Sequence, residues 1–126
     1  MRWIVDGMNV IGCRPDGWWK DRRKAMAALV DSLEQWAGGQ DPGIDVTVVF
    51  EKPPTPPIHS ATITVAHADR AAANSADDEI VRLVQSADDP QEICVVTSDY
   101  ALSTRVRNQG ATVHPAAAFR RTLERQ

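Results

Sequence analysis

The chain has 126 residues, the usual size of one domain, so we expect a single core carrying a single site over residues 1–126. Apolar residues make up 43% and charged residues 25%, a balance that argues against a disordered, collagen-like or membrane-spanning chain. The net charge of −3 does not indicate general affinity for nucleic acid, so such a role would need a local basic patch.

The N-terminal segment and the cysteines indicate a compartment. The first apolar run reaches Asp6 and Asn9 too early to form a signal peptide or a membrane anchor. Cys13 and Cys94 lie far apart and have no metal-ligand spacing, which disfavours a disulfide framework and a zinc site. We therefore expect a cytoplasmic protein that does not enter a membrane.

Two strands and one helix are predicted in the first half of the chain. Residues 3–5 form a short apolar run that stops at an Asp-Gly turn signal, which is typical of a buried strand. Apolar residues recur every three or four positions over residues 22–36, the period of an amphipathic helix, and a pair of glycines ends it. The β-branched run at residues 46–50 predicts a central strand.

A proline-rich segment separates these elements from the next ones. Residues 52–57 contain four prolines, which lack an N–H and fix φ, so we expect an extended surface loop. Residues 62–66 read as a third strand. Ser75, with Asp78 three positions later, is a variant of the capping box and predicts the start of a second helix.

The last third of the chain continues the alternation. Residues 93–96 predict a fourth strand, a third helix follows with Gly110 as its C-cap, and residues 112–113 give a short fifth strand. A final helix follows Pro115. Strands that alternate with helices favour an α/β fold with a central, mostly parallel sheet of about five strands covered on both faces.

Acidic residues follow the strands that such a sheet would place at one edge. Asp6 comes directly after the first strand, and Asp99 follows the fourth within three residues. Ligands of open α/β sheets bind beyond the carboxyl ends of the strands, near the point where the strand order reverses. At about 100° per residue, Asp77 falls on the apolar side of the second helix, whereas Asp78 is rotated toward Arg82.

Converging carboxylates would repel one another unless a divalent cation lay among them, and oxygen ligands suit Mg²⁺ or Mn²⁺. Each residue also has a structural interpretation. Asp6 can belong to an ordinary turn, Asp99 can cap the third helix, and the acids near Asp77 can complement a helix N-terminus. The three acid-bearing element ends favour a functional site only when taken together.

Three blocks of sequence carry a resemblance. Residues 4–11 (I-V-D-G-M-N-V-I), 75–80 (S-A-D-D-E-I) and 95–99 (V-V-T-S-D), followed by Q-G-A-T-V at residues 109–113, resemble the NYN domains of the PIN-like nuclease superfamily, especially the YacP-like branch. The resemblance implies a PIN-like three-layer α/β/α fold.

The resemblance also implies a metal-dependent endoribonuclease that hydrolyses RNA phosphodiester bonds with Mg²⁺ or Mn²⁺. By motif, Asp6, Asp77 and Asp99 match the family's acidic positions, Asn9 matches its accompanying asparagine, and Asp78 is an adjacent metal candidate.

The sequence departs from the family pattern in two places. Relatives often carry Asp and then Gly where this chain has Glu51 and Lys52, which leaves open whether Glu51 joins the site. The residues after Asp99 are Tyr100 and Ala101, where many relatives place a further acid. A thinner acidic set implies weaker metal binding, or one metal instead of two.

RNA must also meet positive charge, and the sequence offers one main cluster for it. Basic residues with aromatics alongside can hold phosphates and stack bases, although a solvated helix start explains the same residues equally well. The expected RNA-binding residues are Arg14, Lys20, Arg22, Arg23, Lys24 and Ser98, with Arg105 and Arg107 as a weaker patch.

A second hypothesis keeps the fold and removes the catalysis. A PIN-like module with a weak or inactive site would bind RNA or a ribosomal or other protein partner, and the thinner acidic set favours it. In either case RNA is the expected partner, the ribosome is a further candidate, and the chain is a monomer or a homodimer.

Overall fold

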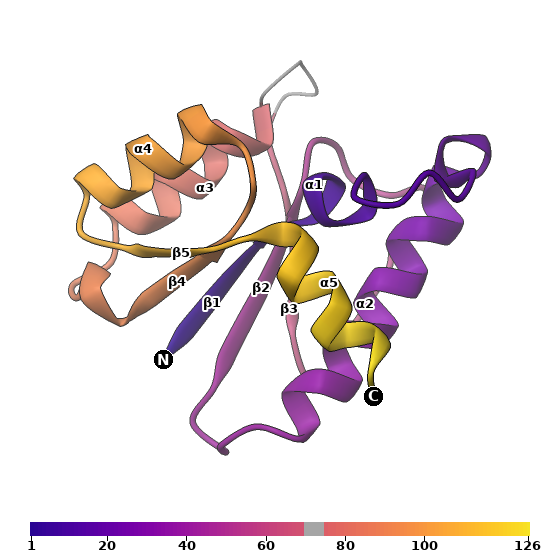
Figure 1. Cartoon of the computed structure of the whole chain (residues 1–126), viewed down its shortest axis with the longest axis horizontal. Coiled ribbons are helices and arrows are strands. Elements are labelled where there is room, and N and C mark those ends of the chain that lie inside the picture. Colours follow the sequence, from indigo (N-terminus) through magenta and orange to yellow (C-terminus); the bar gives the residue numbers. More distant parts are fainter. Residues whose placement is uncertain (70–74) are drawn as a thin grey trace.

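Five parallel strands form one sheet in the computed structural model, which describes residues 1–69 and 75–126 (Figure 1). The strands are β1 (Arg2–Asp6), β2 (Asp45–Phe50), β3 (Thr64–His67), β4 (Ile93–Val96) and β5 (Thr112–His114). The helices are α1 (Gly7–Ile11), α2 (Arg22–Gly38), α3 (Ser75–Gln85), α4 (Tyr100–Asn108) and α5 (Ala116–Glu124), with short 3₁₀ turns η1 (Trp18–Lys20) and η2 (Pro90–Glu92).

The strand order β3-β2-β1-β4-β5 places the reversal of the sheet between β1 and β4. The chain moves from β1 to β2 and β3 on one side, and then returns to build β4 and β5 on the other. The carboxyl ends of β1 and β4 therefore border the crevice where open α/β sheets bind ligands. This confirms the expected α/β fold.

Helices cover both faces of the sheet, with α3 and α4 on one side and α1, α2 and α5 on the other (Figure 1). Alternate strand residues enter different cores because successive side chains point to opposite faces. Val5 and Val48 pack with α2 and α5, whereas Ile4 and Val49 pack with α3 and α4. The central strands are apolar on both faces for this reason.

The short helix α1 was not predicted, because its residues look like turn signals. It begins at Gly7, directly after β1, and lies against β2. A Cβ on Gly7 would lie 2.5 Å from Cε1 of Phe50 and 3.1 Å from Cγ2 of Val48. Only glycine lets the backbone approach the sheet this closely, so the Asp-Gly pair starts a tightly packed helix.

Other elements agree with the sequence apart from their ends. Strand β3 begins at Thr64, two residues later than expected, and the proline-rich segment before it is irregular and mostly exposed. Helix α4 ends at Asn108, and Gly110 follows with a φ of 100°. The N–H of Gly110 donates to the carbonyl of Arg107 and the N–H of Ala111 donates to the carbonyl of Val106, which forms a Schellman motif.

In the described ranges no helix is long and apolar enough to cross a membrane.

Candidate active site

Asp6 lies at the carboxyl end of β1, in the centre of the sheet, and is only 6% exposed. The hydroxyl of Thr97 donates to Oδ2 of Asp6 at 2.9 Å, across the β1–β4 reversal. The same Thr97 oxygen accepts from the backbone N–H of Asp99 at 3.1 Å. Thr97 therefore links two of the acidic residues and fixes the carboxylate of Asp6.

The electrostatic environment of Asp6 disfavours its charge. Burial raises the pKa of Asp6 to about 6, from an ordinary value of 3.8. The Thr97 hydrogen bond lowers this pKa, while the negative charges of Asp77 and Asp99 raise it further. These two acids therefore lie near enough to act on Asp6, although they come from α3 and from the start of α4.

Asp99 caps a helix and also lies near the other acidic residues. It is the N-cap of α4, and its Oδ1 accepts from the N–H of Leu102 at 2.9 Å. This confirms the capping role considered from the sequence. The negative charge of Asp99 also raises the pKa of Asp6 and of Asp77, so this carboxylate lies near both of them.

Asp77 comes from the first turn of α3. Burial raises its pKa, and the negative charges of Asp99, Asp78 and Glu51 raise it as well. The positive charge of Arg105 lowers it. Glu51, whose role the sequence left open, thus lies near Asp77 at the end of β2.

Asp78 faces away from the centre of this group. Its Oδ1 accepts from Nη1 of Arg105, on α4, at 2.9 Å, and its side chain is 76% exposed. The sequence placed Asp78 toward Arg82, but Arg82 instead pairs with Glu79 at 2.7 Å. Contact between α3 and α4 decides this pairing, which helix periodicity alone does not reveal.

Asn9 joins α1 to the loop after β4. Its Oδ1 accepts from the backbone N–H of Ser98 at 2.8 Å. The hydroxyl of Ser98 in turn accepts from the N–H of Ala116 at 2.9 Å, at the start of α5. These bonds hold the loop that carries Thr97 and Asp99 against the end of β1.

The carboxylates of Asp6, Asp77 and Asp99 lie near one another but do not form a ready-made cation site. Across residues 1–69 and 75–126, no three His, Cys, Asp or Glu side chains are arranged to hold one metal ion. The donor chemistry nevertheless fits a hard cation, because Asp6, Asp77 and Asp99 supply only oxygen ligands and their charges oppose one another. A bound cation would relieve that repulsion.

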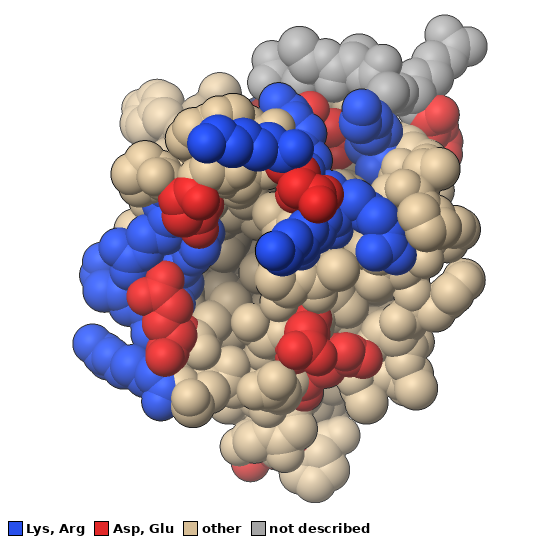
Figure 2. All heavy atoms as spheres, turned by 90° about the vertical axis from the view of Figure 1, so that its right-hand side faces the viewer, with Lys and Arg blue, Asp and Glu red and all other residues tan. Residues whose placement is uncertain are grey.

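The expected RNA-binding residues are not equally free. Arg14 makes an ion pair with Glu124 at 2.8 Å, and Arg23 donates to the carbonyl of Pro56 at 3.0 Å. The guanidinium of Arg22 lies 5.1 Å from the ring centroid of Trp18. Figure 2 shows the side of the molecule with α2 and α5, where Lys and Arg gather on the upper part with Asp and Glu between them.

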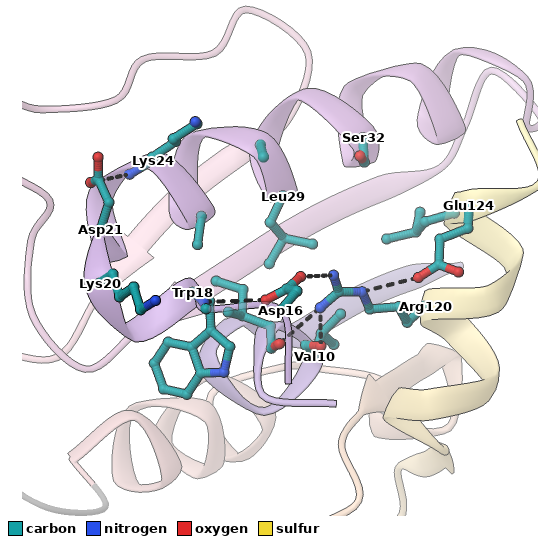
Figure 3. Close-up of a pocket in the computed structure, with 15 residues that line it drawn as sticks. Val10, Asp16, Trp18, Lys20, Asp21, Lys24, Leu29, Ser32, Arg120 and Glu124 are labelled. Carbon is teal, nitrogen blue, oxygen red and sulfur yellow. Dashed lines mark hydrogen bonds and ion pairs between the residues drawn. The ribbon is translucent and has the colours of Figure 1, made fainter. Parts of the chain in front are cut away.

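Lys20 and Lys24 line a separate cavity of about 490 Å³ between α1, α2 and α5 (Figure 3). Arg120 lies at this cavity, and its Nη1 donates to the carbonyls of Val10 at 3.1 Å and Ile11 at 2.8 Å. Sequence analysis did not single out Arg120 as a site residue. No sequence pattern connects it to α1, because the two segments meet only through tertiary packing.

Comparison with known proteins identifies the family. Residues 3–126 match the YacP-like NYN domain, and the chain belongs to that family. The structure is similar to a crystal structure of Rae1 (YacP) from Bacillus subtilis, with a TM-score of 0.77 and 26% identity, covering 99% of this chain and 76% of that one. A tryptophan-to-leucine mutant of Rae1 (YacP) gives a TM-score of 0.70 at 24% identity, covering 99% of this chain and 77% of that one. No curated protein matches by sequence.

Proposed function

We propose that the protein is an endoribonuclease that hydrolyses RNA phosphodiester bonds with Mg²⁺ or Mn²⁺. The observation that carries this proposal is that the negative charges of Asp77 and Asp99 raise the pKa of Asp6, although the three residues come from different elements, with Asp6 at the reversal of the sheet. Membership of a nuclease-family domain supports the same reaction class.

Asp6, Asp77 and Asp99 would hold the cation. Glu51 and Asp78 lie at the edge of this group and act on Asp77. A cation bound there would neutralise charge on the scissile phosphate, favour attack by water and stabilise the leaving oxygen. Thr97 holds the Asp6 carboxylate in place through its hydrogen bond.

In this proposal two further side chains would contact the substrate. The Oδ1 of Asn9 accepts from the N–H of Ser98, and the side-chain amide nitrogen of Asn9 is the group that would donate to a phosphate oxygen. Arg105 uses Nη1 for Asp78 and is 45% exposed, so its other N–H groups can bind a phosphate beside Asp77.

Two observations favour a second function, an RNA-binding module without catalysis. The described carboxylates are not arranged as a ready-made metal site, and Tyr100 and Ala101 stand where many relatives carry an acid. A module of this kind would bind RNA independently of Mg²⁺ or Mn²⁺.

A cleavage assay separates the two functions. Single-stranded RNA labelled at one end is incubated with the protein in Mn²⁺, in Mg²⁺ or in EDTA, with DNA of the same sequence in parallel. We expect internal cuts with either ion and none in EDTA. Asp77→Asn should slow cleavage by at least about 100-fold, because losing a metal ligand exceeds the usual effect of losing its supporting residues.

The matched control is Asp88→Asn, which removes an exposed carboxylate away from the crevice. It should cleave at the wild-type rate. Cleavage that persists in EDTA, or that survives Asp77→Asn, contradicts the metal-dependent mechanism. RNA binding without cleavage under every condition supports the second function instead.

A further inference from the structure

The cavity between α1, α2 and α5 has walls of different chemistry (Figure 3). Helix α2 contributes Lys24, Leu29 and Ser32, while Arg120 and Glu124 come from α5 at the other end. Its apolar lining, called the apolar floor below, consists of Val10, Ile11, Ala25, Ala28, Leu29 and Leu123. A volume of about 490 Å³ is within the range of small-molecule sites.

Most of the charged groups in the cavity already have partners. Arg120 forms an ion pair with Asp16 at 3.1 Å, and Glu124 is bound by both Arg14 and Arg120. The side chain of Asp21 accepts from the N–H of Lys24 and caps α2. The three carboxylates that line the cavity are therefore neutralised or engaged.

Two cations remain without such partners. In the described part of the chain, neither Lys20 nor Lys24 takes part in an ion pair. Trp18 lines the same end of the cavity, and Trp19 beside it is 51% exposed. An apolar floor, an aromatic wall and two free ammonium groups favour a planar ligand with negative charge.

We propose that this cavity binds one nucleotide of the substrate RNA, with the base against the apolar floor and a phosphate at Lys20 and Lys24. This inference rests on the proposed function. Helix α1 connects the two places, because Asp6 precedes it and Ile11 lines the cavity. At about 1.5 Å per residue, the ends of this five-residue helix lie about 6 Å apart. A strand with one phosphate at the carboxylates would therefore reach the cavity with a nearby nucleotide.

Binding of single nucleotides tests this directly and needs no cleavage. Each of the four nucleoside 5′-monophosphates is titrated into the protein in EDTA, and tryptophan fluorescence reports binding at Trp18 and Trp19. We expect a saturable change with at least one nucleotide. Lys20→Ala combined with Lys24→Ala should raise Kd about tenfold, because two solvent-exposed charged contacts are lost. Arg82→Ala, which removes an exposed cation on α3, should leave Kd unchanged.

A second variant tests the cavity by filling it. Ala28 lines the cavity and is exposed, so Ala28→Phe should block binding while preserving the fold. Gln35→Phe adds the same ring on the exposed side of α2, outside the cavity, and should bind like the wild type. Circular dichroism confirms that both variants fold.

Three results would overturn the assignment. The first is that no mononucleotide gives a response at about 10 mM, well above the expected Kd for a small ligand. The second is that Ala28→Phe binds nucleotides as the wild type does. The third is that the wild type is a dimer and Ala28→Phe is a monomer, which would make this face a contact between copies. Because binding is measured in EDTA, it can fail while metal-dependent cleavage stands. If RNA is not cleaved, the proposed function fails separately.

Discussion

Replacing Asp6 with asparagine should remove catalysis and stabilise the fold. The pKa of Asp6 is raised from 3.8 to about 6, so its ionisation costs about 3 kcal/mol in the folded state. When the pKa of an acid is higher in the folded state than in the unfolded state, its protonated form stabilises the fold. This contribution is complete at a pH below the pKa of the unfolded state, and it is lost as the pH rises through the pKa of the folded state. Asparagine resembles the protonated carboxyl, and its oxygen can still accept from Thr97.

The stability gain should therefore depend on pH. We expect the free energy of unfolding of Asp6→Asn to exceed that of the wild type by about 3 kcal/mol at a pH of about 7.5 and by about 1 kcal/mol at a pH of about 4.5. Urea unfolding followed by tryptophan fluorescence measures both values in the absence of metal. Asp88→Asn, an exposed change, should show no such gain. An Asp6→Asn variant that is less stable than the wild type at neutral pH, or a gain that does not change with pH, would refute this reasoning.

Three further predictions concern packing and substrate contact. Gly7→Ala should destabilise the protein by about 1–3 kcal/mol in urea unfolding, because its Cβ would meet Phe50 at 2.5 Å; an unchanged midpoint would contradict this close approach. Gly110→Ala should cost about 1–2 kcal/mol, since its φ of 100° disfavours a side chain, and a smaller loss of thermal stability would argue against the Schellman motif. Arg105→Ala should reduce the slope of log K for RNA binding against log salt concentration by about 1. An equal effect from Arg107→Ala would remove any special role for Arg105.

The parts of the fold that local patterns determine were predictable. Helix α2 has a regular apolar stripe, and β2 is a β-branched run, so both followed from the sequence. Helix α1 was missed because it has only five residues and contains Gly7 and Asn9, which also favour turns. Its position depends on packing against β2, which no local pattern reports.

In the candidate site, too, some features could be predicted from the sequence and others depend on tertiary packing. Asp6 and Asp99 follow strands, so the parallel sheet predicted their common edge, and the β1–β4 pairing supports it. The pairing of Asp78 with Arg105 could not be predicted, because it depends on how α3 lies beside α4. The contacts of Arg120 with α1 likewise require the complete fold.

The most direct test of the central claim is a crystal structure of the active protein in saturating Mn²⁺, with the anomalous signal used to locate the ion. We predict a peak that Asp6, Asp77 and Asp99 contact together. An active protein whose crystals show no peak in this crevice, or a peak held by other residues, would contradict the proposed metal site.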